Sequence, residues 1–134
     1  MLIKNDIKGS LCSFELSELL KQKGFRCLTL TAYDTNKNLM TNNIQANNWI
    51  GWISAPTHDL AKEWIRVNFN IWIYVKKKWD DGNFVGYESI IELSDEIKKC
   101  GVFESPEQAT EEALLFTTKN LLIKSKSEDV LEGF

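Results

Sequence analysis

Within the stretch SAPTHDLAKEWIRVNFNIWIYV, the spacing of apolar residues changes from that of a helix to that of a strand. We expect the rest of the chain to pack around this stretch. Thr57 can cap a helix, and the apolar residues that follow it share one helix face. Asn70 tolerates the left-handed conformation that ends many helices, and β-branched and aromatic residues come after it. We therefore predict a helix over 58–68 joined closely to a strand over 71–79, with Trp64 buried between the sheet and a neighbouring helix.

Two other helices are indicated by their first residues. Ser13 can cap a helix over 14–23, which carries acidic residues early and lysines late. Ser105 is followed by Pro106, a residue that suits the first position of a helix. The apolar and small residues that come next predict a helix over 106–124.

The remaining segments are predicted from alternation and from turn residues. Residues 27–33 alternate between apolar and polar side chains, residues 49–54 form a short apolar run, and residues 84–93 follow an Asp-Gly turn. We predict a strand in each of these segments. The Asn-rich residues 34–48 are typical of a long loop, and residues 95–100 of a short helical turn.

The turn of the hairpin can be chosen from the faces of its two strands. A two-residue turn would set apolar residues of one strand opposite polar residues of the other. A three-residue loop over 80–82 instead places Ile71 opposite Ile91 and Val75 opposite Tyr87. Because this register keeps the apolar side chains on one face, we predict the three-residue loop.

These elements predict an α+β fold. We expect an antiparallel sheet of three to four strands, with about three helices packed mainly on one of its faces. Residues 1–124 are expected to form a single domain, because a chain of 134 residues has the length of one domain. Residues 125–134 are polar and charged, and we expect them to fray.

Composition excludes several classes of protein. The net charge of −3 does not favour general affinity for nucleic acid, which usually needs a basic face. Neither a signal peptide nor an apolar run long enough to cross a membrane is visible. The three cysteines, Cys12, Cys27 and Cys100, show no metal-binding spacing and are typical of reduced thiols. We therefore predict a cytoplasmic protein that does not bind membranes.

Catalytic and metal-binding patterns are weak. His58 is the only histidine, and it does not share a helix face with the adjacent Asp59. We interpret it as an exposed residue in the first turn of a helix. Glu107, Glu111 and Glu112 have polar neighbours, and we interpret them as part of a solvated helix face. No catalytic residue, metal site or cofactor is predicted.

The predicted binding surface lies on the strand over 71–79. Alternation places Trp72, Tyr74, Lys76 and Lys78 on the face opposite the core. Exposed aromatic side chains with a polar margin are typical of protein interfaces. A helix or the loop over 34–48 could instead cover the aromatic residues, or the lysines could contact the phosphates of a nucleic acid.

Three stretches carry a resemblance to a known group of proteins. The passage APTHDLAKEWIRVNFNIWIYV, the helix SPEQATEEALLFTTKNLLI and the leading SFELSELLKQKGF resemble a family of small uncharacterised accessory proteins from prophages and mobile elements of gut bacteria. The chain departs from the family pattern at Phe69, where a histidine is expected, and at Pro106, where a tyrosine is expected. The resemblance implies the α+β fold and an accessory role, and it implies no reaction.

We predict first a non-enzymatic protein-interaction module of phage or mobile-element origin, which binds an unidentified protein or a second copy of itself. The alternative is a small nucleic-acid-binding accessory protein that uses the hairpin face over 71–79. An enzyme is the third possibility.

Overall fold

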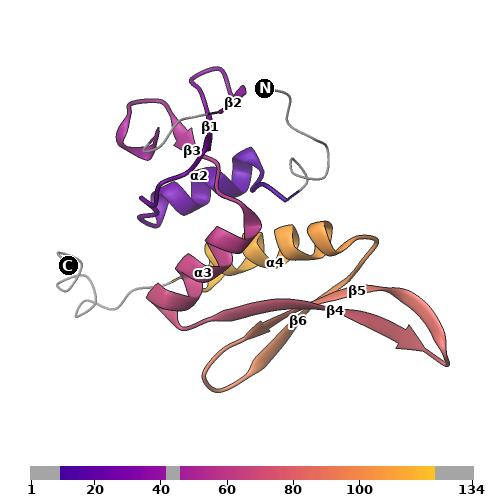
Figure 1. Cartoon of the computed structure of the whole chain (residues 1–134). Coiled ribbons are helices and arrows are strands. Elements are labelled where there is room, and N and C mark those ends of the chain that lie inside the picture. Colours follow the sequence, from indigo (N-terminus) through magenta and orange to yellow (C-terminus); the bar gives the residue numbers. More distant parts are fainter. Residues whose placement is uncertain (1–9, 42–45, 123–134) are drawn as a thin grey trace.

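The computed structural model describes residues 10–41 and 46–122 of the chain (Figure 1). Residues 125–134, for which fraying is predicted, lie outside this part of the chain. The described helices and strands are α2 (Phe14–Gln22), β1 (Thr31–Tyr33), β2 (Leu39–Thr41), the short 3₁₀-helix η1 (Ala46–Asn48), β3 (Ile53–Ser54), α3 (His58–Phe69), β4 (Trp72–Asp80), β5 (Asn83–Glu92), β6 (Ile97–Phe103) and α4 (Pro106–Asn120).

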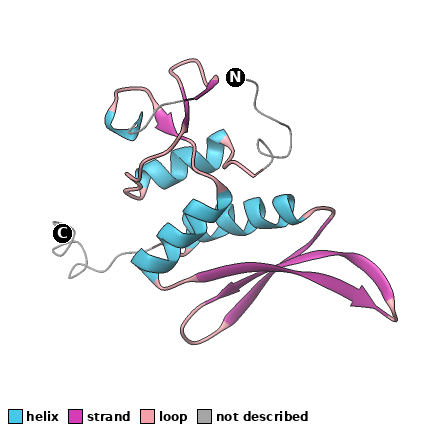
Figure 2. Cartoon of the chain, in the orientation of Figure 1, coloured by secondary structure: helices cyan, strands magenta, loops and turns pink. Residues whose placement is uncertain are grey.

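The α+β fold class is confirmed, but the strands are divided between two antiparallel sheets instead of one. The first sheet has the order β2-β1-β3 and the second the order β4-β5-β6. Helices α2, α3 and α4 lie between the two sheets (Figure 2). The larger sheet, β4-β5-β6, therefore has helices on one face, as predicted.

The helices begin at the predicted caps. The side-chain oxygens of Ser13, Thr57 and Ser105 accept hydrogen bonds from backbone N–H groups in the first turns of α2, α3 and α4. Asn70 ends α3 in the left-handed conformation, with φ of 56°. Helix α4 ends at Asn120 and is thus four residues shorter than the predicted span.

One apolar core joins the helices to the larger sheet. Ile73 and Ile91 are opposite each other on β4 and β5 and face the helices. The buried members of this core come from residues far apart in the sequence, and they are Cys12, Leu16, Leu20, Phe25, Ala61, Ile65, Ile71, Ile73, Ile91, Ala113, Leu114 and Leu122. Its continuity shows that the segment around α2 packs on the same core as the larger sheet.

Trp64 is only half-buried, so the prediction of a buried side chain between the sheet and a helix is wrong. Its ring packs edge-to-face on Phe25, just after α2, and on Phe69, at the end of its own helix. Trp64 therefore joins α3 to the segment that follows α2.

The β4-β5 hairpin closes with the two-residue turn Asp81-Gly82, and the predicted three-residue loop is wrong. Both turn residues have positive φ, 49° and 80°, as a type I′ turn requires. A bulge inserts Val85 as an extra residue of β5 and shifts the following residues of β5 by one position. The apolar side chains of β4 and those of β5 therefore still lie on the same face of the sheet. Ile91 consequently lies opposite Ile73, and its predicted pairing with Ile71 is wrong.

The bulge also changes the pairing along the rest of the hairpin, because Val75 lies opposite Ser89 and not opposite Tyr87. The bulge ends at Gly86, whose φ is 148°. A Cβ atom there would lie 2.6 Å from a methyl group of Val102 on β6. Glycine at this position thus permits both the backbone conformation and the close approach of β6.

Two predicted strands are shorter than expected. The segment 27–33 forms a strand only from Thr31 onward, where β2 and β3 become its partners. Leu28 and Leu30 precede this pairing and are exposed. The segment 49–54 is reduced to β3, its last two residues.

Two segments predicted without strands contain them. The predicted loop over 34–48 includes β2 and η1, although its residues 42–45 lie outside the described part. The helical turn predicted over 95–100 is wrong, because β6 begins at Ile97 and pairs with β5. Sheet hydrogen bonding to β5, which no local pattern shows, determines the conformation of this segment.

Candidate functional site

The larger sheet has one face turned away from α3 and α4, which we call the outer face. Figure 1 shows both helices on the opposite side of this sheet. Strand alternation and register place ten side chains on the outer face, namely Trp72, Tyr74, Lys76, Lys78, Glu88, Ile90, Glu92, Ile97, Lys99 and Val102. All four residues of the predicted binding surface belong to this set.

The two aromatic residues of the outer face are exposed. Trp72 is 51% exposed and Tyr74 is 40% exposed. The described part of the predicted loop over 34–48 forms β2 and η1, and β2 pairs in the smaller sheet. The predicted exposure of both aromatic residues is therefore confirmed, whereas their contact with a partner stays a prediction.

A buried carboxylate lies among the lysines of this face. Glu88 is only 5% exposed, and its two oxygens lie 3.9 Å from the Nζ atoms of Lys76 and Lys78. One negative charge thus faces two positive charges, which leaves a net positive charge at this end of the outer face. The same ion pairs neutralise part of the positive charge that binding to the phosphates of a nucleic acid would require.

Neighbouring side chains hold the aromatic rings in place. The guanidinium of Arg66 on α3 lies 5.1 Å from the centre of the Trp72 ring, a cation–π distance. The Tyr74 hydroxyl donates to a carboxylate oxygen of Glu92 at 3.5 Å. These contacts reduce the side-chain freedom that binding would otherwise remove.

A second cluster, which the sequence does not predict, surrounds Glu111 on α4. His58 Nε2 lies 2.9 Å from Glu111 Oε1, and the Ser13 backbone N–H donates to the same oxygen at 3.3 Å. The Ser13 hydroxyl donates to Oε2. One carboxylate therefore joins the first residues of α2 and α3 to the middle of α4.

This cluster corrects two interpretations. His58 is 5% exposed, so it is not an exposed first-turn residue. Glu111 is half-buried and accepts from two other segments, so it does not belong to a solvated face. Glu112 is exposed, as predicted, and Asp59 is exposed as well. These groups come together because the segments of α2, α3 and α4 pack against one another. The spacing of residues within any one segment does not bring them together.

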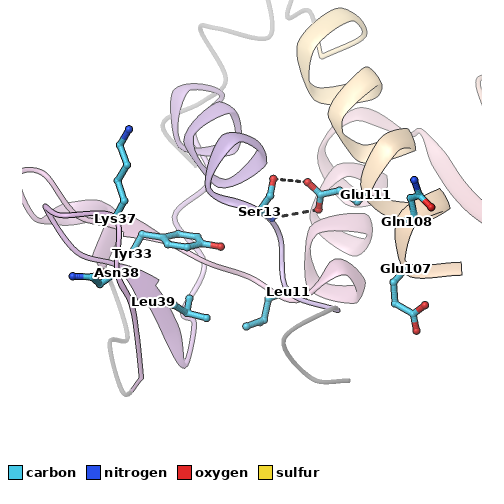
Figure 3. Close-up of a pocket in the computed structure, with 9 residues that line it drawn as sticks. All are labelled: Leu11, Ser13, Tyr33, Lys37, Asn38, Leu39, Glu107, Gln108 and Glu111. Carbon is cyan, nitrogen blue, oxygen red and sulfur yellow. Dashed lines mark hydrogen bonds between the residues drawn. The ribbon is translucent and has the colours of Figure 1, made fainter. Parts of the chain in front are cut away.

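An open pocket of about 630 Å³ lies beside Glu111 (Figure 3). Tyr33 from β1 and Glu107 and Gln108 from α4 line it, together with Lys37 from the turn between β1 and β2. The Tyr33 hydroxyl donates to the Cys12 carbonyl oxygen at 2.9 Å. The polar groups at the Glu111 wall of the pocket are thus already bonded within the protein.

The geometry of this cluster does not support nucleophilic catalysis. A serine nucleophile must donate its hydroxyl hydrogen to a base such as histidine. The single hydroxyl hydrogen of Ser13 goes to Glu111, and the same oxygen accepts from the Leu16 N–H as the helix cap. Among the described residues, no group of three or more His, Cys, Asp or Glu side chains could hold a metal ion.

The three thiols form no disulfide, and the pKa of each is raised. Burial raises the pKa of the Cys12 thiol well above its ordinary value, and the charge of Glu111 raises this pKa further. Burial also raises the pKa of Cys27 and that of Cys100. For Tyr33, burial and then the charges of Cys12 and Glu111 raise the pKa to about 12. Because the thiolate is the nucleophile, these thiols are poor candidates for catalysis.

We expect the Cys12 thiol to make stability fall with pH above about 9. Its folded pKa lies above its unfolded value, so the folded chain keeps a proton that the unfolded chain releases as the pH rises. One such group lowers the free energy of unfolding by about 1.4 kcal/mol per pH unit above its unfolded pKa. Urea unfolding between pH 7 and 10 should show a shallower decline for Cys12→Ala. Equal slopes for both proteins would contradict the assignment.

The chain matches no protein-family model, no curated protein and no solved structure. Among the described residues, no helix has both the length and the apolar character needed to cross a membrane.

Proposed function

We propose that the chain is a non-enzymatic protein-interaction module of phage or mobile-element origin that acts in the cytoplasm. Its binding surface is the outer face of the β4-β5-β6 sheet, and its ligand is a segment of a partner protein. The proposed origin rests on the sequence resemblance described above.

The observation that supports this function is the exposure of apolar side chains on a regular sheet face. Besides the two aromatic residues, Ile97 is 59% exposed and Val102 is 43% exposed. Apolar area of this kind next to charged side chains is typical of interaction sites. The paired strands below it form a rigid support, so binding requires little ordering of the backbone.

Substitution of both aromatic residues tests the function. Trp72→Ser with Tyr74→Ser should keep the circular-dichroism spectrum and cooperative melting, because both side chains are exposed. Immobilised wild-type protein should capture a partner from an extract of the native host, and the double variant should lose this capture. Trp49→Ser is the matched control, since Trp49 is 48% exposed and follows η1, outside the larger sheet.

A photo-crosslinking amino acid at position 74 should link the captured protein, whereas the same group at position 49 should not. Capture that persists in the double variant would contradict the proposal. Retention on single-stranded DNA that weakens with salt would favour the nucleic-acid alternative. Concentration-dependent elution in size-exclusion chromatography that the double variant abolishes would assign the face to self-association.

A further inference from the structure

The outer face has the dimensions of a peptide-binding surface. Its edge strand β6 has seven residues and the sheet has three strands, so the face measures about 23 Å by about 14 Å, or about 330 Å². A stable interface between globular proteins buries about 800 Å² per partner. A second copy that used this face alone would therefore fall short, whereas an extended peptide of eight residues spans about 26 Å and fits its length.

The charges of the outer face indicate the chemistry of such a peptide. Lys76, Lys78 and Lys99 lie on the face, and Arg66 lies against Trp72 at its edge. The acidic residues of the face are Glu88, which is buried, and Glu92, and Arg66 is paired with Glu63 of its own helix at 3.7 Å. Positive charge beside exposed aromatic rings is complementary to a segment that combines carboxylates with apolar side chains.

The chain itself contains a segment of this composition. Residues 127–134 read SEDVLEGF and contain no lysine or arginine. The three acidic residues and the three large apolar residues of this segment are Glu128, Asp129, Glu132, Val130, Leu131 and Phe134. Its charge is opposite in sign to the net charge of the outer face, and its apolar side chains suit the aromatic rings.

Only a short length of chain joins this segment to the core. Leu122 is 2% exposed and belongs to the same core as Ile71, the residue before β4. From Leu122 to Ser127 the chain can span about 17 Å when extended. Layers of side chains packed on a sheet are about 10 Å thick, so this length exceeds the thickness of one such layer.

We propose that residues 127–134 bind the outer face of the β4-β5-β6 sheet within the same chain. The segment then occupies the surface to which the partner binds. The partner binds there through its own stretch of acidic and apolar residues, which competes with the segment. This last step rests on the proposed function, because it requires that the partner uses the outer face.

Charge reversal in the full chain tests the contact. The variant Glu128→Lys with Asp129→Lys should shift the indole N–H signal of Trp72 in a ¹H–¹⁵N spectrum, in which each tryptophan is assigned by substitution with phenylalanine. The signals of Trp49 and Trp64 should stay in place. The matched control is Glu15→Lys with Glu18→Lys, which makes the same charge change at two exposed positions of α2 and should leave Trp72 unchanged.

A synthetic peptide with the sequence of residues 127–134 should return the Trp72 signal of the charge-reversed variant toward its wild-type position. A peptide whose three acidic residues are replaced by lysine should have no effect. An identical Trp72 signal in the wild type and the charge-reversed variant would overturn the inference. A wild-type Trp72 signal that moves on dilution would also overturn it, because the occupant would then belong to a second copy.

The capture experiment separates this inference from the proposed function. If the inference holds, Glu128→Lys with Asp129→Lys should capture more partner than the wild type, because the competing segment is weakened. An unchanged Trp72 signal together with capture that needs Trp72 and Tyr74 would overturn only the inference. A shifted Trp72 signal together with capture that does not need these residues would overturn only the proposed function.

Discussion

Glu111→Ala is expected to lower the free energy of unfolding by about 3 kcal/mol. The carboxylate accepts hydrogen bonds from the Ser13 hydroxyl and from His58 Nε2, and a bond to a charged group contributes about 1.5–3 kcal/mol. Its removal would leave the nearly buried His58 ring without this partner, which adds a desolvation cost. Chemical denaturation of the two proteins at pH 7 measures the difference.

The matched control for this substitution is Glu112→Ala. Glu112 is the next residue of α4 and is exposed, so its loss should change stability by less than about 0.5 kcal/mol. A double-mutant cycle of Glu111→Ala with His58→Ala should give a coupling energy of about 1 kcal/mol or more. Equal losses for the two glutamate variants would show that the cluster does not hold the helix segments together.

Helices were predictable because their signals are local. Ser13, Thr57 and Ser105 cap their own helices through backbone groups only three residues away, so the capping pattern can be read in the sequence. Asn70 ends α3 for a reason that is also local, its tolerance of positive φ. The end of α4 was misplaced by four residues, because the apolar pattern continues beyond Asn120.

The hairpin shows where local signals become insufficient. Asp81-Gly82 favours a two-residue turn, but such a turn alone conflicts with the positions of the apolar residues. The chain resolves this conflict with a bulge at Val85, beside the glycine that lets β6 approach. The faces were predictable from alternation, whereas the register depends on the bulge at Val85, which the sequence pattern did not reveal.

The contacts of Glu111 could not be predicted from one sequence. Ser13 and Glu111 are separated by 98 residues, and His58 and Glu111 by 53. A glutamate on a helix among polar neighbours has the pattern of a solvated residue, and only the packing of α4 beside α2 and α3 changes its surroundings. The exposed residues of β4 on the outer face were predictable, because strand alternation needs only their own neighbours. Those of β6 were not, because a helical turn was predicted in that segment.

Trp64→Ala is expected to lower the free energy of unfolding by about 3 kcal/mol, at the low end of the range for large aromatic residues. The ring centre lies 5.4 Å from that of Phe25 and 5.5 Å from that of Phe69. Edge-to-face pairs at such distances contribute about 0.5–1.5 kcal/mol each beyond the area they bury. Because Trp64 is half-buried, the full cost of a buried tryptophan is not expected.

Trp79→Ala is the matched comparison for the contribution that Trp64 makes to stability. Trp79 also packs edge-to-face, on Phe84, but it lies near the hairpin turn and is 59% exposed. Its loss should therefore cost about 1 kcal/mol, the upper part of the range for one aromatic pair. Urea unfolding should give the larger loss for Trp64→Ala, since only Trp64 joins α3 to the segment after α2. Similar losses for the two variants would mean that Trp64 does not join these segments.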